Sequence, residues 1–285
     1  MFEAQFEEAE TFKRIIEGVK DIVNDTNLEI SPRGLFMQAL DPSHVAMVEL
    51  KIRATDFYIY NCKSSCTIGI NIPSLYKILK FAHSNCSLIL CFSDLAPNKL
   101  VLNFQAKDHS KFTEFHLNLF SVETEHLASP EIEWVSEIRL HSSEFTKICK
   151  ELEHISESVR ISVKSRASAL HHRNSVVFSV DGELGSGDIE VAVNDYAEGE
   201  EASEETKREN QEEGSVVQGV FEEELKASFA LRYLNMIAKG SVVSNYVFLN
   251  FAHHGPMKVV FYFGKHGKLE FYLAPKIEDG QSEAS

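Results

Sequence analysis

Apolar residues recur with the same spacing in two segments of the chain, residues 12–23 and 145–156. In each segment four apolar residues follow one another at steps of three, four and three, which places them along one stripe of an α-helix. The pattern therefore predicts two amphipathic helices whose stripes face a core. The stripe residues are Phe12, Ile15, Val19 and Ile22 in the first segment and Phe145, Ile148, Leu152 and Ile155 in the second.

Basic residues lie off the apolar stripe in both segments and in two shorter helical patterns, at residues 75–82 and 231–238. A solvated helix face is the ordinary explanation for such charges on a single helix. Four helices that each carry cations on the outer side favour instead a surface that binds a polyanion. The basic residues are Lys13, Arg14, Lys20, Lys77, Lys80, Lys147, Lys150, His154, Arg232 and Lys239.

The distances between these patterns indicate two related halves with an insertion in the second. Phe145 follows Phe12 by 133 positions, whereas Leu231 follows Leu75 by 156 positions. The second half must therefore contain about 23 extra residues. Residues 195–214 are highly charged and almost free of apolar side chains, so they cannot bury enough surface to fold. We expect this acidic segment to be the insertion.

Short runs of β-branched and aromatic residues, many of them alternating with polar residues, fill the intervals between the helical patterns. Many strands and few helices in each half predict an α+β fold of two similarly folded domains, each an antiparallel sheet with two helices on one face. We expect domains at residues 1–120 and 136–285, joined by a connector at 121–135. The predicted strands are residues 45–53, 57–62, 87–92, 99–105, 111–119, 160–163, 175–180, 189–193, 216–221, 242–251, 259–263 and 268–273.

Composition limits the class of protein. The 285 residues include 28 Lys and Arg against 43 Asp and Glu, a formal charge of −15, so nucleic acid would be repelled unless the cations gather on one surface. No run of 18 apolar residues and no signal-peptide pattern occurs, which predicts a soluble intracellular protein without a membrane partner. The five cysteines are expected to be reduced thiols. Cys62 and Cys66 lack a second pair at zinc-ligand spacing, so no metal or cofactor is expected.

Five segments carry a resemblance to a known family. They are MFEA at the start, LDPSHVAMVEL at residues 40–50, SLYKILKFA at 74–82, FALRYLN at 229–235 and YLAPKIED at 272–279. In this order, and over nearly the whole chain, they resemble proliferating cell nuclear antigen (PCNA), the eukaryotic DNA sliding clamp family. The resemblance implies a nuclear, non-enzymatic homotrimer that a separate clamp loader closes around double-stranded DNA. It also implies that the ring closes through residues 111–119 of one chain and 184–192 of the next.

The resemblance implies a second site, a hydrophobic pocket beneath the connector that binds the PIP-box peptides of DNA polymerases, flap endonuclease, DNA ligase and other partners. From the residues alone, Val45 and Met47 fit an ordinary strand core equally well. The resemblance also places Lys164 close to the lysine that receives ubiquitin in this family. The pocket positions carried over are Leu40, His44, Val45, Met47, Leu127, Pro256, Tyr272, Ala274 and Pro275.

We therefore predict a sliding clamp that tethers replication and repair enzymes as a processivity factor. Three alternatives stay open: a subunit of a heterotrimeric checkpoint clamp, a nuclease with acidic metal ligands, and a protein-interaction scaffold on which the outward cations are incidental. Residues 182–187, GELGSG, contain glycines like those of a phosphate loop but lack its Lys-Ser/Thr ending, so we expect a hairpin turn there.

Overall fold

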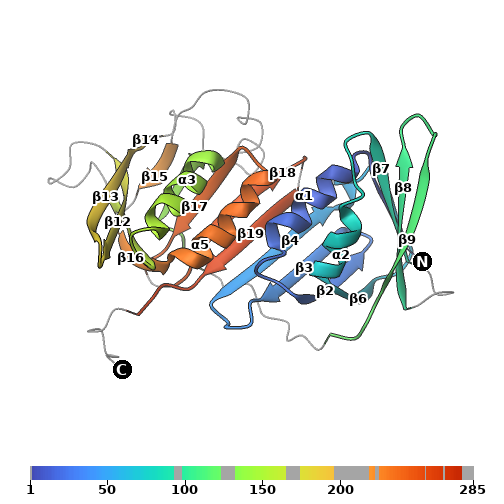
Figure 1. Ribbon diagram of the computed structural model, residues 1–285, viewed down its shortest axis with the longest axis horizontal. Coiled ribbons are helices and arrows are strands. Elements are labelled where there is room, and N and C mark those ends of the chain that lie inside the picture. The colour runs from blue at the N-terminus through green and yellow to red at the C-terminus, as the bar shows by residue number, and fades with distance from the viewer. Residues whose placement is uncertain are drawn as a thin grey trace. The chain divides into compact units, whose positions relative to one another are not determined.

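The structure is a computed structural model that describes residues 2–92, 98–122, 132–164, 174–195, 218–221, 225–253, 255–265 and 267–277. The chain divides into two compact units. The first unit comprises Met1–Ala128 together with Tyr262–Glu270, and the second comprises Ser129–Phe261 together with Phe271–Ser285. Each unit combines antiparallel sheets with a pair of α-helices, as Figure 1 shows for α1 and α2 and for α3 and α5.

The first unit contains two sheets. One has the strand order β5-β1-β7-β8-β9, and the other has the order β19-β4-β3-β2-β6, with the residues of β19 up to Glu270 belonging to this unit. The strands are β1 (Phe2–Phe6), β2 (Asp25–Ser31), β3 (Gly34–Leu40), β4 (Ala46–Arg53), β5 (Ile59–Cys62), β6 (Cys66–Asn71), β7 (Cys86–Phe92), β8 (Lys99–Ala106), β9 (Phe112–Asn118) and β19 (Gly267–Leu273). A 3₁₀ turn, η1 (Ala54–Asp56), follows β4.

Two helices cover one face of the first unit, α1 (Ala9–Val19) and α2 (Ile72–Leu79). All four residues of the predicted stripe in α1 and the turn after it are buried, so the helical period read from the sequence is confirmed. Helix α2 begins at a capped end, where the Asn71 side chain accepts a hydrogen bond of 2.9 Å from the Ser74 N–H and Pro73 occupies the first turn. These two features fix the start of the helix.

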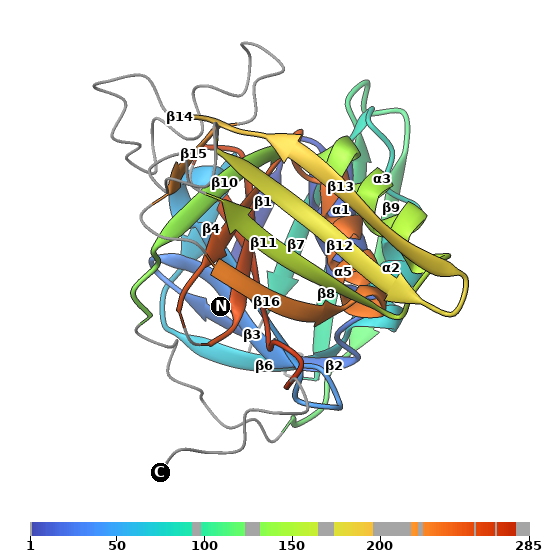
Figure 2. The ribbon, with the colours of Figure 1, turned by 90° about the vertical axis from the view of Figure 1, so that its left-hand side faces the viewer.

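The second unit repeats this plan. Its four-stranded sheet has the order β13-β12-β11-β16, seen face-on in Figure 2, and its second sheet has the order β14-β15-β10-β17-β18. The helices are α3 (Ser142–Glu153) and α5 (Leu231–Ile237), and the 3₁₀ turn η2 (Ala238–Val242) follows α5. The strands are β10 (Ser136–His141), β11 (Ser158–Lys164), β12 (Ser175–Gly182), β13 (Gly185–Ala192), β14 (Asn194–Asp195), β15 (Gln218–Phe221), β16 (Leu225–Ala230), β17 (Tyr246–Phe251) and β18 (Met257–Phe263).

Most predicted elements are confirmed, but the strand at 242–251 was wrong at its start. Residues up to Val242 belong to η2, and β17 begins only at Tyr246. The reason lies at Gly240, where a Cβ atom would come within 2.5 Å of the Phe261 ring, so the backbone approaches the core closely there and turns before it extends. The hairpin at residues 182–187 is confirmed, since Gly182 pairs with Gly185, whose φ is +137°.

Six strands were missed because their residues are polar or too short in alternation to give a strong pattern: β1, β2, β3, β6, β10 and β16. The insertion after Asp195, the segment 165–173 with His171 and His172, and connector residues 123–131 with Leu127 lie outside the described residues. None of the helices that the structure describes is long and apolar enough to span a membrane. All five cysteines are free.

Candidate functional site

The basic face of the first unit is organised by Tyr76 of α2. Its hydroxyl donates a 3.0 Å hydrogen bond to Glu17 of α1, and burial together with this carboxylate raises the pKa of the phenol, so it stays a neutral donor. The ammonium groups of Lys20 and Lys80 lie 5.3 Å and 5.8 Å from the Tyr76 ring centre. One aromatic ring therefore positions a cation from each helix by cation–π attraction.

The predicted cations differ in how far neighbouring carboxylates neutralise them. Arg14 pairs with Glu10 at 3.0 Å, Lys20 with Asp21 at 2.8 Å and Lys147 with Glu151 at 3.8 Å. In the part of the chain that the structure describes, no carboxylate pairs with the remaining lysines of α1, α2 and α3, which are Lys13, Lys77, Lys80 and Lys150. These four keep their full attraction for an external anion.

The second unit carries its own basic face on α3 and α5. Lys147, Lys150 and His154 are exposed along α3, and its stripe residues Phe145, Ile148 and Leu152 are buried on the other side. Arg232 of α5 lies over the Tyr233 ring at 4.7 Å and donates a 3.2 Å hydrogen bond to its hydroxyl, and Lys239 is exposed in η2.

Each unit thus holds its predicted cations on the solvent side of its helix pair. Long lysine and arginine side chains on a regular surface suit phosphate groups, which attract cations without any base-specific hydrogen bonding. The arrangement can bind a nucleic-acid backbone in a way that does not depend on its sequence.

Four of the residues predicted for the peptide pocket lie on the β3–β4 hairpin of the first unit, where the Asp41 side chain builds the turn. Its carboxylate accepts hydrogen bonds from the N–H groups of Ser43, Val45 and Ala46 at 2.9, 2.7 and 2.7 Å. This network holds His44 exposed with φ +57°. Leu40 and Val45 are half-buried, and Met47, which pairs with Leu40 across the hairpin, is buried as a core residue would be.

The second unit holds the other described pocket candidates. Tyr272 is buried and its ring lies 6.4 Å from that of Trp134, and the two residues that follow β19, Ala274 and Pro275, are exposed and half-buried. Pro256 is half-buried just before β18. Leu127 lies outside the described residues. The functional role of all these positions stays a prediction.

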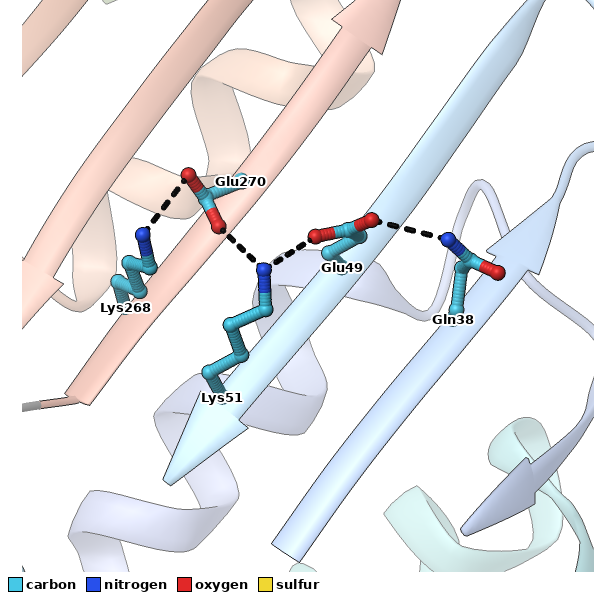
Figure 3. Close-up of polar contacts among 5 residues, drawn as sticks. All are labelled: Gln38, Glu49, Lys51, Lys268 and Glu270. Atoms are coloured by element: carbon cyan, nitrogen blue, oxygen red, sulfur yellow. Dashed lines mark hydrogen bonds and ion pairs between the residues drawn. The ribbon is translucent and has the colours of Figure 1, made fainter. Parts of the chain in front are cut away.

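Beside Met47 on the same strand face lies a buried charge network that the sequence analysis did not predict (Figure 3). The Lys51 ammonium contacts Glu49 at 2.6 Å and Glu270 at 3.3 Å, while Gln38 donates to Glu49 at 2.9 Å and Lys268 pairs with Glu270 at 3.2 Å. Partial burial alone lowers the pKa of Lys51, but hydrogen bonds and charge attraction from the two carboxylates outweigh it, so this pKa is raised. The network ties β4 to β19.

Replacing Lys51 by methionine is expected to lower the free energy of unfolding by about 2 kcal/mol, since two buried carboxylates would lose their shared cation. The 38% exposure of Lys51 keeps this loss below the roughly 3–5 kcal/mol of fully buried pairs. Urea unfolding at neutral pH measures it. Because the pKa of Lys51 is raised, its contribution is lost only as pH rises through the folded pKa, so the difference should stay constant between about pH 6 and 9.

The matched control for this network is Glu49→Gln in the Lys51→Met background. It removes one buried charge and keeps an acceptor for Gln38, so it should recover part of the lost stability. Equal stability of the wild type and Lys51→Met would contradict the assigned role of the network.

The two units each end a sheet with an open strand, β9 in the first and β13 in the second. Ladder contacts at both ends of β9, Lys111 O to Ala106 N and Leu119 N to Asn98 O, direct odd-numbered residues toward β8. The backbone groups of the even residues 112–118 therefore point away from the sheet. In β13, Val193 N donates to Asn174 O, so residues 186, 188, 190 and 192 point outward in the same way.

Large apolar side chains accompany these open edges. Phe112 at the start of β9 is 60% exposed, and Phe81, which packs on Phe115 of β9 at 4.7 Å, is 52% exposed. In the β12–β13 hairpin Leu184 is 83% exposed. Unpaired strand edges with exposed apolar residues are surfaces on which a further strand can pair.

The sequence pattern missed three features of these sites. Glu49 and Lys51 alternate with the apolar residues of β4, a signal of a charged strand face that could have been read, but their partner Glu270 is 219 residues from Lys51. The ring of Tyr76 gave no signal among the other residues of its helix. Strand parity at β9 and β13 depends on hydrogen-bond register, which the sequence does not contain.

Comparison with protein families gives two matches. A family model described as proliferating cell nuclear antigen, N-terminal domain, matches residues 1–126, and one described as proliferating cell nuclear antigen, C-terminal domain, matches residues 128–276. Together the two models cover nearly the whole chain in the order that the helix spacing predicts.

Proposed function

The chain belongs to the proliferating cell nuclear antigen family of DNA sliding clamps, and from this we propose that three copies close head to tail around double-stranded DNA in the nucleus. As such a ring it would tether replication and repair enzymes as their processivity factor. The observation that carries the proposal is the pair of open edges: one chain has an unpaired strand with exposed apolar neighbours in each unit, β9 and β13.

Two different edges on one chain favour a homotrimer over a subunit of a heterotrimeric checkpoint clamp. When each copy offers β9 to the β13 of the next, the interface is heterologous, and a rotation that closes produces a ring of identical chains. A chain that pairs only with other kinds of subunit would not need to match its own opposite edge. The basic helices in both units support the same assignment, because every domain of the ring would then face the DNA with cations.

Partner recruitment is proposed through the hairpin carrying Leu40, His44, Val45 and Met47 and through Pro256, Tyr272, Ala274 and Pro275, with Leu127 of the connector. The partners would be PIP-box proteins such as DNA polymerases, flap endonuclease and DNA ligase. Apolar anchors that fill a pocket commonly supply most of the binding free energy in such complexes. Opening the ring for DNA is proposed to need a separate ATP-driven clamp loader, and Lys164 at the end of β11 is the proposed region of ubiquitin attachment.

Topological loading tests the clamp proposal. The protein is loaded with a clamp loader and ATP onto nicked circular DNA, the free protein is removed by gel filtration, and half of the sample is linearised. We expect the protein to stay on the circle and to leave the linear DNA, because an encircling ring slides off free ends whereas a surface binder does not. Retention on both forms would overturn the proposal, and cleavage of the circle that depends on a divalent metal would support the nuclease alternative.

A further inference from the structure

A groove of about 860 Å³ lies within the second unit, between the sheet that Figure 2 shows face-on and the residues after β17 and β19. One wall is formed by β11 and β16, and the other by Phe251, His253, Pro275 and Ile277. A space of this size fits a short peptide or a small ligand and is far too small for a duplex. Its lining shares only Pro275 with the proposed peptide pocket.

The groove is strongly basic in a chain that is strongly acidic overall. Its lining holds the cations Arg160, Lys164, Lys226 and Lys276 and one carboxylate, Asp188, although the whole chain has a formal charge of −15. Of these cations, Lys164 and Lys226 have no ion-pair partner within the described ranges of the chain. Cations collected in a concave surface concentrate the attraction for an anionic ligand there.

Strand register places these cations on one face. Ser162 of β11 pairs with Lys226 of β16, and Arg160 pairs with Ser228, so residues of even number on both strands share one side of the sheet. Val159, Ile161 and Val163 occupy the other side and are buried. Arg160, Lys164 and Lys226 therefore stand on the same surface, spaced by the two-residue period of a strand.

The open edge of β16 adds backbone groups to this surface. The Ser228 carbonyl accepts a 2.7 Å hydrogen bond from the Lys276 N–H, so even-numbered residues of β16 direct their backbone groups away from β11. Lys226 has the same parity as Ser228, and its N–H and C=O consequently face the groove. An extended peptide can meet both a backbone donor and acceptor and a row of cations there.

We propose that this groove binds an acidic, extended segment of a partner protein, with carboxylates at alternate positions contacting Lys164, Lys226 and Arg160. Charge complementarity identifies the occupant as acidic, and the two-residue spacing of the cations requires the acidic residues of the segment to alternate. This surface goes beyond the clamp function, because it would add a second class of partner to those that bind through apolar anchors.

The probe is a fluorescein-labelled ten-residue peptide in which glutamate alternates with serine and valine, titrated with the full chain by fluorescence polarisation at low salt. We expect saturable binding that the Lys164→Glu/Lys226→Glu variant weakens by about tenfold or more, since each substitution turns an attraction into a repulsion. Lys164→Gln/Lys226→Gln should weaken binding less. A peptide of the same composition with its glutamates in one block should also bind less tightly.

A matched variant separates the groove from net charge. Lys63→Glu/Lys99→Glu changes the charge by the same amount at two exposed positions of the first unit and should leave peptide affinity unchanged. Tyr272→Ala should leave it unchanged as well, because Tyr272 does not line the groove. Thermal unfolding of each variant shows whether it is folded.

Three outcomes would overturn the proposal. The first is equal affinity of the wild type and the folded Lys164→Glu/Lys226→Glu variant. The second is binding that appears only after deletion of residues 197–214, which would make the chain's own acidic segment the occupant. The third is a ten-nucleotide single strand that binds in a Lys226-dependent manner while the peptide does not, which would make the groove a nucleic-acid site.

Discussion

His116→Pro is expected to convert the trimeric clamp into monomers while each chain stays folded. His116 has the parity of β9 residues whose N–H points away from β8, so proline removes a donor from the open edge and leaves the pairing with β8 intact. Proline is tolerated on an edge strand for the same reason. An added strand from the next chain would lose this ladder bond and meet the proline ring instead, at all three interfaces of the ring.

Sedimentation velocity measures the result. The wild type should sediment as a species of three 32.2 kDa chains and the variant as a single chain, with unchanged circular dichroism. His116→Thr is the matched control, because it replaces the same exposed side chain but keeps the N–H, and it should remain trimeric. Loss of the trimer in His116→Thr would show that the side chain rather than the strand edge makes the interface. A trimeric His116→Pro would contradict the role of β9.

A mixture of two variants tests the head-to-tail arrangement. Asp188 of β13 points its backbone groups outward, so Asp188→Pro should block the opposite edge. His116→Pro keeps a working β13 and Asp188→Pro keeps a working β9, so an equimolar mixture should form heterodimers although each variant alone is monomeric. An interface that joins identical edges would give no heterodimer in this mixture.

The sequence predicts the helices better than the sheets, and the reason is physical. In α1 and α3 a helix buries a stripe with a fixed period, so Phe12, Ile15 and Val19 announce their geometry without reference to the rest of the chain. In β2 and β6, residues such as Asn27 and Gly69 lie in strands only because neighbouring strands pair with them. Gly69 shows this most clearly, since a Cβ there would come within 2.0 Å of the Phe120 carbonyl.

The same distinction holds for the sites. The cations of the helix faces could be predicted because each lies at a helical angle from its own apolar stripe. The Lys51 network and the groove with Lys164 and Lys226 could not, because they join residues that are distant along the chain and meet only through strand register. The opposite edges at β9 and β13 came from the resemblance, and register explains which of their residues face outward.

The last prediction concerns which cations hold DNA. Lys77→Ala/Lys80→Ala is expected to weaken retention of the clamp on DNA far more than Arg14→Ala/Lys147→Ala, although both remove two positive charges. Arg14 and Lys147 are partly neutralised by Glu10 and Glu151, whereas no carboxylate within the described residues pairs with Lys77 or Lys80. An ammonium without a competing carboxylate releases more counterions when it meets a phosphate.

Salt dependence gives this prediction a number. Each lost phosphate contact lowers the slope of log affinity against log salt by about 0.9, and a trimer loses each contact up to three times, so the slope should fall by up to about 5 for Lys77→Ala/Lys80→Ala. Retention on closed circular DNA across a salt series measures the slope, with sedimentation velocity confirming an intact trimer. Equal slopes for the two variants would mean that the carboxylates of Glu10 and Glu151 do not screen their partners. An unchanged slope in both would mean that the helix faces do not contact DNA, and the polyanion surface inferred from the paired helices would then have no DNA-binding role.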